Sequence, residues 1–217
     1  MRRASRRPRR NPSPLDNPAF RRWFGESVVV DERGEPLVVY HGTDKVFDVF
    51  RAHSRSINTT TFGPVETERT GIFLSTNPAF SAEYGRRLMR VYASIEDPAE
   101  ITRDLVLAFA DSLDPFGAER ELWLQAKYSR SAWTLFDGEL GRRFVAFLRS
   151  HEHDGATFDE NVVVEDGEIA GRTYVAFDPT QIKSATDNVG TYDPSDPSIL
   201  KNRRSSRRAR RTSRRSR

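Results

Sequence analysis

Three residues with binding or catalytic chemistry stand side by side at His41, Gly42 and Thr43. They end an apolar run, residues 37–40, which follows a Gly-Pro turn and is typical of a core strand. A strand that ends in this way delivers an imidazole and a hydroxyl to one edge, and its glycine lets a planar group such as a carboxamide approach the backbone. These residues alone leave two interpretations open: a ligand-binding edge, or a core histidine followed by a turn glycine.

A second strand-like run, residues 71–76, also ends in hydroxyl groups. An Asn-Pro pair follows it, which is typical of a helix start. Three apolar side chains spaced by four residues are expected on one stripe of this helix: Phe80, Tyr84 and Leu88. Periodicity leaves open whether Tyr84 is a core residue or stacks on a ligand.

The His-Glu-His-Asp sequence at 151–154 has the residue types of a metal site. A spacing of two puts both histidines on the same side of a strand but on opposite sides of a helix, and no third ligand is evident. The chain has no cysteine, which excludes disulfides and thiolate metal sites. We therefore expect no metal.

The first part of the folded region is expected to position His41. A short amphipathic helix is predicted at 17–24, and two strands at 27–31 and 37–41 are predicted to form a hairpin with His41 at its far end. The polar, Thr-rich stretch 53–70 lacks periodicity and is predicted to be a loop that could act as a lid. The side chains expected to pack beneath His41 are Phe47, Val49 and Phe50.

The later part of the chain alternates between helix and strand patterns. Three helical segments form a predicted insert, at 101–113, 118–128 and 132–150. Strands are predicted at 89–95, 155–158, 161–165 and 172–178, with a hairpin turn at Asp166-Gly167.

Charge divides the 217-residue chain into three parts. Residues 1–15 contain six Arg, and residues 201–217 contain nine Arg and one Lys, with no acidic residue in either arm. The 19 basic and 31 acidic residues that remain make the middle strongly acidic. We expect residues 16–200 to form one folded domain and both arms to be disordered, since they have little to bury and much like charge.

Arg-rich arms suit phosphate, so the arms are predicted to bind nucleic acid without sequence preference. Two alternatives stay open: the arms dock on the chain's own acidic surface, or they act as a localisation signal. The sequence contains no apolar run of membrane-spanning length and no secretory h-region, so we expect a soluble protein.

Three segments of the chain together resemble a known superfamily. They are Tyr40-His41-Gly42-Thr43, the run 71–76 with Tyr84 after it, and the run 173–185, which reads Thr-Tyr-Val-Ala-Phe-Asp-Pro-Thr-Gln-Ile-Lys-Ser-Ala. The chain is similar to ADP-ribosyltransferases of the diphtheria-toxin and poly(ADP-ribose) polymerase type, and most similar to the ADP-ribosyltransferase-like domain of phage polyvalent proteins. The resemblance covers roughly residues 18–197. It implies an α+β fold with a split antiparallel sheet, a helical insert, and NAD as substrate in a crevice between two small sheets.

The resemblance also implies roles for individual residues. His41 would bind the adenosine-side ribose, Gly42 would hold the nicotinamide carboxamide through its backbone, and Tyr84 would stack on the nicotinamide ring. Phe73 stands where the family commonly has a second tyrosine, so stacking survives there but the phenol hydrogen bond does not. The remaining predicted NAD contacts are Thr43 and Ser75.

The chain departs from the family at Thr173. Toxin and polymerase relatives have a glutamate at this position, which binds the nicotinamide ribose and stabilises the cation as the glycosidic bond breaks. Gln181, Glu168 and Glu165 are alternative sources of the missing polar group, and the absence of any replacement is the fourth possibility. The departure favours single transfer over polymer synthesis.

Two classes of function follow. In the first, the chain is a mono-ADP-ribosyltransferase that modifies a protein or nucleic acid, with His41, Tyr84, Thr173 and Gln181 in the catalytic site. In the second, it is a catalytically silent NAD-fold module whose basic arms bind or condense nucleic acid. Either would act in the host cytoplasm or in association with the virion.

Overall fold

The structure is a computed structural model, and it describes residues 13–60, 63–113, 132–164, 167–188 and 190–200. Nearly all of both Arg-rich arms and the helix predicted at 118–128 lie outside these residues.

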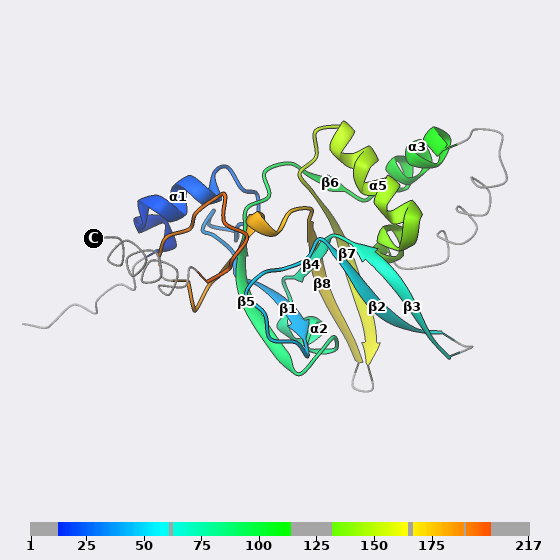
Figure 1. The fold of residues 1–217 in the computed structure, drawn as a ribbon, viewed down its shortest axis with the longest axis horizontal. Coiled ribbons are helices and arrows are strands. Elements are labelled where there is room, and N and C mark those ends of the chain that lie inside the picture. The colour runs from blue at the N-terminus through cyan, green and yellow to red at the C-terminus, as the bar shows by residue number, and fades with distance from the viewer. Residues whose placement is uncertain (1–12, 61–62, 114–131, 165–166, 189, 201–217) are drawn as a thin grey trace, which may run out of the picture.

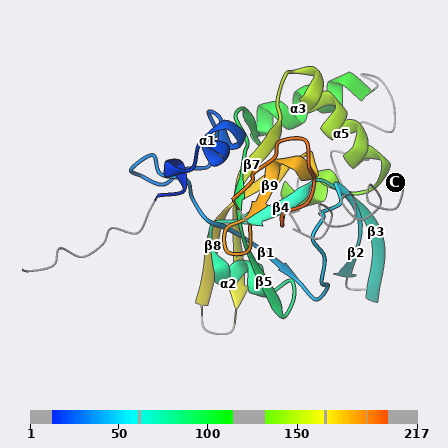
Figure 2. The same cartoon turned by 60° about the vertical axis from the view of Figure 1, so that its left-hand side comes forward.

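One seven-stranded sheet forms the centre of the fold (Figures 1 and 2). All neighbouring strands are antiparallel except β6 and β7, which are parallel. In their order across the sheet, the strands are β6 (Pro98–Glu100), β7 (Gly155–Val164), β8 (Gly167–Ala176), β4 (Ile72–Ser75), β1 (Val39–Thr43), β5 (Arg87–Ala93) and β9 (Ile182–Ser184).

The sheet is split between β1 and β4. These strands share a single paired position, Tyr40 opposite Ser75, whereas β1 pairs with β5 at five positions and β4 pairs with β8 at four. The sheet therefore consists of two halves joined at one point, β6-β7-β8-β4 and β1-β5-β9. The predicted α+β class with a split antiparallel sheet is confirmed, and the split lies within one sheet.

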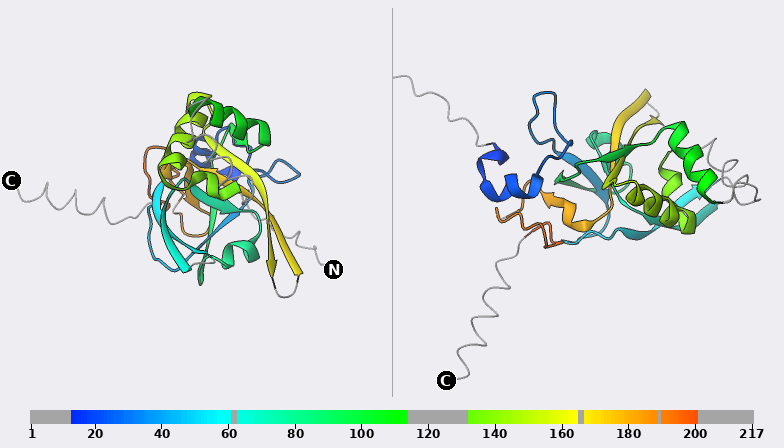
Figure 3. Two further views of the ribbon diagram at one scale, coloured as in Figure 1. Left: turned by 90° about the vertical axis from the view of Figure 1, so that its right-hand side faces the viewer. Right: turned by 90° about the horizontal axis from the view of Figure 1, so that it is seen from above.

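Two apolar clusters cover the two faces of the sheet, because successive side chains along a strand point to opposite faces. On β8, Val175 joins one cluster, whereas Tyr174 and Ala176 join the other. The helices α3 (Arg103–Leu113) and α5 (Gly138–Ser150) cover the face of Val175 (Figures 1 and 3). Their aromatic side chains Phe109 and Phe144 pack with ring centroids 4.9 Å apart.

The short helix predicted near the N-terminus is confirmed as α1 (Pro18–Phe24), which follows a single 3-10 turn, η1 (Pro14–Asp16). The Asn17 side chain caps it by accepting a hydrogen bond from the Ala19 amide. Its buried aromatic side chains pack with a tyrosine of β5 in a third cluster, made of Phe20, Trp23, Phe24 and Tyr92.

The strands β2 (His53–Thr60) and β3 (Gly63–Thr70) form a separate two-stranded sheet. The prediction of a loop over 53–70 is wrong, since the two strands pair at eight positions. Threonine favours strands, but a polar sequence without apolar alternation gave no periodic signal. Ion pairs from Arg69 to Asp137 and from Arg142 to Glu68 hold this hairpin against the segment that contains α5.

The helix predicted after the Asn-Pro pair is present but short. It is α2 (Pro78–Ala82), with Asn77 as its cap, and it ends before Tyr84. The predicted stripe is therefore wrong: Tyr84 follows the helix in a turn, and Leu88 lies in β5. Gly85 interrupts the helical pattern between them.

The predicted hairpin that presents His41 forms only in part. Residues 27–31 contribute one isolated bridge, from Val30 to Pro36, and β1 continues through Thr43. His41 therefore lies in the middle of its strand, where the sheet divides, rather than at a hairpin end.

Two other predicted segments have different boundaries. The helix predicted at 132–150 is divided at Asp137 into the 3-10 helix η2 (Ala132–Phe136) and α5. The strands predicted at 155–158 and 161–165 are one continuous strand, β7. After β8, a last 3-10 turn, η3 (Pro179–Gln181), leads into β9.

Candidate functional site

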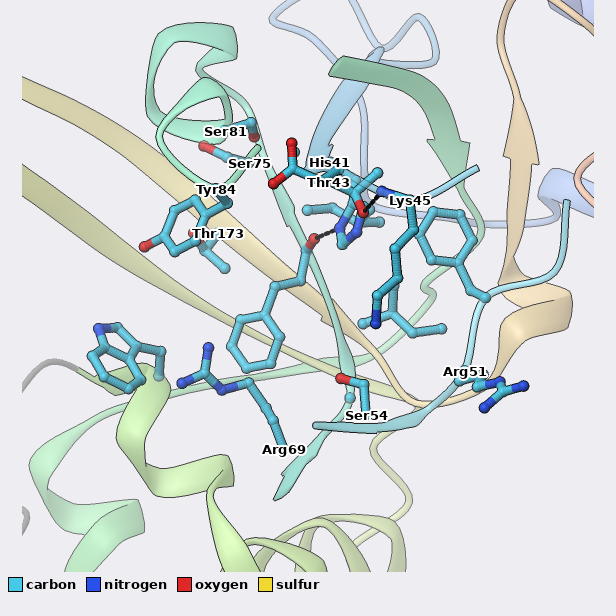
Figure 4. Close-up of a pocket in the computed structure, with 18 of the residues that line it drawn as sticks. His41, Thr43, Lys45, Arg51, Ser54, Arg69, Ser75, Ser81, Tyr84 and Thr173 are labelled. Atoms are coloured by element: carbon cyan, nitrogen blue, oxygen red, sulfur yellow. Dashed lines mark hydrogen bonds between the residues drawn. The ribbon is translucent and has the colours of Figure 1, made fainter. Parts of the chain in front are cut away.

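A cavity of about 850 Å³ opens where β1 and β4 separate (Figure 4). Its wall includes residues of β1 and the segment that follows it, of β4, of the turn after α2, and of β7 and β8. In the view of Figure 4, Tyr84 and Thr173 lie on one side of His41, and Lys45 and Arg51 lie on the other. All six predicted NAD contacts line this cavity: His41, Gly42, Thr43, Phe73, Ser75 and Tyr84.

His41 reaches across the split in the sheet. Its Nδ1 lies 2.9 Å from the backbone carbonyl oxygen of Phe73 on β4. A carbonyl oxygen only accepts, so Nδ1 carries the proton and Nε2 of the neutral ring is an acceptor. Burial lowers the pKa of His41 from its usual 6.5, and the Phe73 carbonyl opposes this shift in part. The ring is thereby held neutral and in one orientation at physiological pH.

The aromatic packing predicted beneath His41 is confirmed for two of its three residues. The rings of Phe50 and Phe47 lie edge-on to the imidazole, with centroids 5.0 and 6.3 Å from it. Val49 is 39% exposed instead.

Gly42 is required by the packing of the chain itself. A Cβ at this position would lie 1.7 Å from the carbonyl oxygen of Ser81. The Ser81 hydroxyl also donates a hydrogen bond of 3.0 Å to the Tyr40 carbonyl, which fastens the end of α2 to β1. Gly85 also lies close to the backbone of β1, since a Cβ at this position would lie 2.3 Å from the Thr43 carbonyl carbon. These close approaches place the turn that carries Tyr84 at the cavity.

Phe73 and Tyr84 are two of the aromatic residues that line the cavity. Phe73 packs edge-on against Phe136, with centroids 5.4 Å apart. Tyr84 packs against Phe80 at 5.5 Å and is 52% exposed. Desolvation raises the pKa of Tyr84, and the nearby charge of Glu160 raises it further. Tyr84 is therefore a neutral ring with an open surface rather than the core residue that helical periodicity allowed.

Thr173 points a hydroxyl group at a carboxylate that the sequence did not single out. It is buried, and its Oγ1 donates a hydrogen bond of 2.7 Å to Oε2 of Glu160 on the neighbouring strand β7. Glu160 is half-buried and lines the same cavity. Desolvation raises the pKa of Glu160, whereas the Thr173 hydrogen bond and the charge of Arg69 lower it.

The three predicted replacements for the family glutamate lie elsewhere. Gln181 is not among the residues of the cavity wall, and its side chain holds backbone groups: its oxygen accepts from the Phe177 and Asp178 amides, and its nitrogen donates to the Ser94 and Asp154 carbonyls. Glu168 is exposed and accepts a hydrogen bond from the Asn161 side chain. It precedes Thr173 by five residues along β8. Glu165 lies outside the described residues. Neither Gln181 nor Glu168 lines this cavity.

Four basic side chains also line the cavity: Lys45, Arg51, Arg55 and Arg69. Thr43 orders the start of the segment that follows β1, because its Oγ1 accepts a hydrogen bond of 3.1 Å from the Lys45 amide. Arg69 is fixed by a bond of 2.9 Å from its Nε to Asp137, and its guanidinium lies 4.5 Å from the centroid of the Trp133 ring.

Several residues of this wall were not singled out in the sequence, among them Glu160, Trp133 and the basic residues Lys45, Arg51 and Arg69. Glu160 fell in the gap between two predicted strands. If residues 155–164 had been treated as one strand, the predicted turn at 166–167 would have paired it with β8 and set Glu160 diagonally beside Thr173. No signal in the sequence pointed to Trp133.

Among the described residues, no group of three or more side chains could hold a metal ion. His151 hydrogen-bonds the Phe147 carbonyl, and His153 contacts Asp97. Within the same part of the chain, no helix has the length and apolar character needed to cross a membrane.

A family model described as ADP-ribosyltransferase in polyvalent proteins matches residues 31–192. The match spans well over half of the chain and includes every residue of the cavity wall. No curated protein and no solved structure matches the chain.

Proposed function

The chain belongs to the ADP-ribosyltransferases of polyvalent proteins, and we propose that it is a mono-ADP-ribosyltransferase that takes ADP-ribose from NAD. The observation that carries the proposal is that one cavity gathers His41, Gly42, Tyr84 and Thr173 from three segments that lie far apart in the sequence. These are the residues at which the chain resembles the family.

The cavity has suitable chemistry for the nicotinamide, a ribose and the pyrophosphate of NAD. Phe73 and Tyr84 supply ring surfaces for the nicotinamide, and the backbone of Gly42 supplies a donor and an acceptor for its carboxamide. Gly42 lies two residues beyond Tyr40, the one position where β1 pairs with β4, so its peptide groups point toward the open side of the split. The neutral His41 offers Nε2 to a ribose hydroxyl, and Lys45 and Arg51 offer positive charge to the pyrophosphate.

The reaction exchanges one bond for another at the ribose carbon that carries nicotinamide. The bond to nicotinamide breaks, nicotinamide leaves with the bonding electrons as a neutral molecule, and an acceptor lone pair forms the new bond while its proton passes to solvent. Positioning and electrostatic stabilisation of the positive charge on the ribose serve such a reaction.

Calorimetric titration with NAD, combined with a nicotinamide-release assay, tests this function on the full chain. We expect saturable binding and release of nicotinamide by the wild type, and weaker binding by His41→Ala. A wild type that binds no NAD would overturn the proposal.

The second candidate is a catalytically silent NAD-fold module whose basic arms bind or condense nucleic acid. The observation that favours it is the absence of a carboxylate at Thr173 itself, together with 16 basic residues in the two arms. In either case we propose that the arms bind nucleic acid, and that the chain acts in the host cytoplasm or with the virion. NAD binding without nicotinamide release would select this candidate.

A further inference from the structure

We propose that Glu160 is the catalytic carboxylate of this chain, supplied from β7 and positioned by Thr173. The assignment rests on the proposed function, and it names a residue that no sequence motif marks. Glu160 would stabilise the positive charge that develops on the ribose as the bond to nicotinamide breaks.

The pairing of β7 with β8 explains how the carboxylate reaches the cavity. Phe158 lies opposite Thr173, and Glu160 lies opposite Gly171, so Glu160 and Thr173 are diagonal neighbours on one face of the sheet. Gly171 has no side chain to fill the space opposite Glu160, and a Cβ there would lie 2.9 Å from the Ser75 hydroxyl. The Glu160 side chain can therefore lean toward Thr173, which donates the 2.7 Å hydrogen bond to it.

The other carboxylates at the cavity are placed differently. Three of the described lining residues are acidic: Asp44, Glu83 and Glu160. Asp44 is exposed and paired with Arg86, and Glu83 is exposed on the turn after α2. Glu160 alone among these three is half-buried, and a carboxylate acts more strongly on a developing charge where water is partly excluded.

The groups around Glu160 are consistent with a carboxylate whose pKa is set by its surroundings, rather than with a structural ion pair. Desolvation raises its pKa, and Thr173 on β8 and Arg69 on β3 draw it back down. Tyr84 lies on the turn after α2, and the charge of Glu160 contributes to the raised pKa of its phenol. The carboxylate thus faces a neutral phenol, a hydroxyl donor and a cation around one space, and it must be ionised to act.

Glu160→Gln tests the assignment, and Asp159→Asn is its matched control. The control removes the same charge from the next residue, which points to the other face of β7 and pairs with Arg172 in solvent. We expect Glu160→Gln to bind NAD within about twofold of the wild type and to release nicotinamide about 10²- to 10⁴-fold more slowly. Asp159→Asn should match the wild type in both measurements.

Thr173 acts through Glu160, so its test is a pH profile. The Thr173 hydrogen bond lowers the pKa of Glu160. Nicotinamide release should increase with pH as Glu160 ionises, and Thr173→Val should shift this increase to higher pH. Thr173→Ser should return the pH profile to that of the wild type. If the wild type releases nicotinamide and Glu160→Gln releases it at a rate within about threefold of the wild type, the assignment of Glu160 alone is overturned. A wild type that binds no NAD overturns the proposed function as well. A wild type that binds NAD without releasing nicotinamide also overturns it and selects the silent binding module.

Discussion

His41 Nδ1 lies 2.9 Å from the Phe73 carbonyl oxygen, and this contact joins the two halves of the sheet at the point where strand pairing stops. The imidazole occupies a place where a continuous sheet would have a backbone donor. The cavity is therefore a consequence of the split, and the residue that bridges the split also faces the cavity.

His41→Ala should weaken NAD binding by roughly tenfold, because it removes one hydrogen-bond acceptor for a ribose hydroxyl. Calorimetric titration measures the change. His151→Ala is the control, since that histidine is exposed at the C-cap of α5 and does not line the cavity. Equal NAD affinity of the wild type and His41→Ala would contradict the assigned role.

NAD affinity should also depend on pH through His41. The folded-state pKa of His41 is lowered from 6.5, so the ring stays neutral, with Nε2 as acceptor, down to a pH below that value. Affinity should be constant above pH 6.5 and fall as the pH drops through the lowered pKa and Nε2 becomes protonated. His41→Gln should lack this fall, and a wild type whose affinity increases on acidification would contradict the prediction.

Tyr84 should contribute through its ring rather than its hydroxyl. Tyr84→Phe should keep wild-type NAD affinity, whereas Tyr84→Ala should lose about three- to tenfold by removing a stacking face. Titration of both variants separates the two. A loss in Tyr84→Phe as large as in Tyr84→Ala would assign the effect to the hydroxyl instead.

The half-buried carboxylate of Glu160 should lower stability while it serves function. Its folded-state pKa is raised, so ionisation opposes folding as the pH rises above the usual value of 4.5. Glu160→Gln should therefore unfold at a higher temperature than the wild type at neutral pH. This gain should disappear below about pH 4, where both side chains are neutral. Thermal unfolding followed by circular dichroism at several pH values measures it, and a gain that grows on acidification would contradict the prediction.

Removal of the arms should abolish nucleic-acid binding. Sixteen basic residues at 1–15 and 201–217 can neutralise many phosphates, so affinity of the full chain for DNA should fall by about 10³-fold or more between 50 and 200 mM salt. Residues 16–200 alone should bind weakly, since that region is acidic. Equal binding by the trimmed and full chains would show that the arms are not the binding element.

The sequence predicted those parts of the fold that local chemistry controls. The Asn-Pro caps started α1 and α2 where expected, and the apolar run 71–76 became β4. The prediction from sequence was wrong at 53–70, where two strands pair although the segment has no apolar alternation. It was also wrong at Tyr84, where the close approach of the turn to Gly42 takes the place of a continued helix.

The candidate site was predictable as a set of motifs but not as a geometry. His41, Phe73 and Tyr84 line one cavity as the resemblance implied, whereas Gln181 is held by backbone groups. Glu160 escaped notice because its contact with Thr173 depends on the register of two strands. A side chain that reaches a site from a neighbouring strand leaves no mark in a linear motif.

The most direct test of ADP-ribosyl transfer uses NAD labelled in its adenosine part. The full chain would be incubated with this NAD, DNA and cell lysate, and covalently transferred label would be measured beside released nicotinamide. We expect transfer by the wild type and by Asp159→Asn, and at least about a hundredfold less by Glu160→Gln. Wild-type samples with neither transferred label nor released nicotinamide would contradict the enzymatic function.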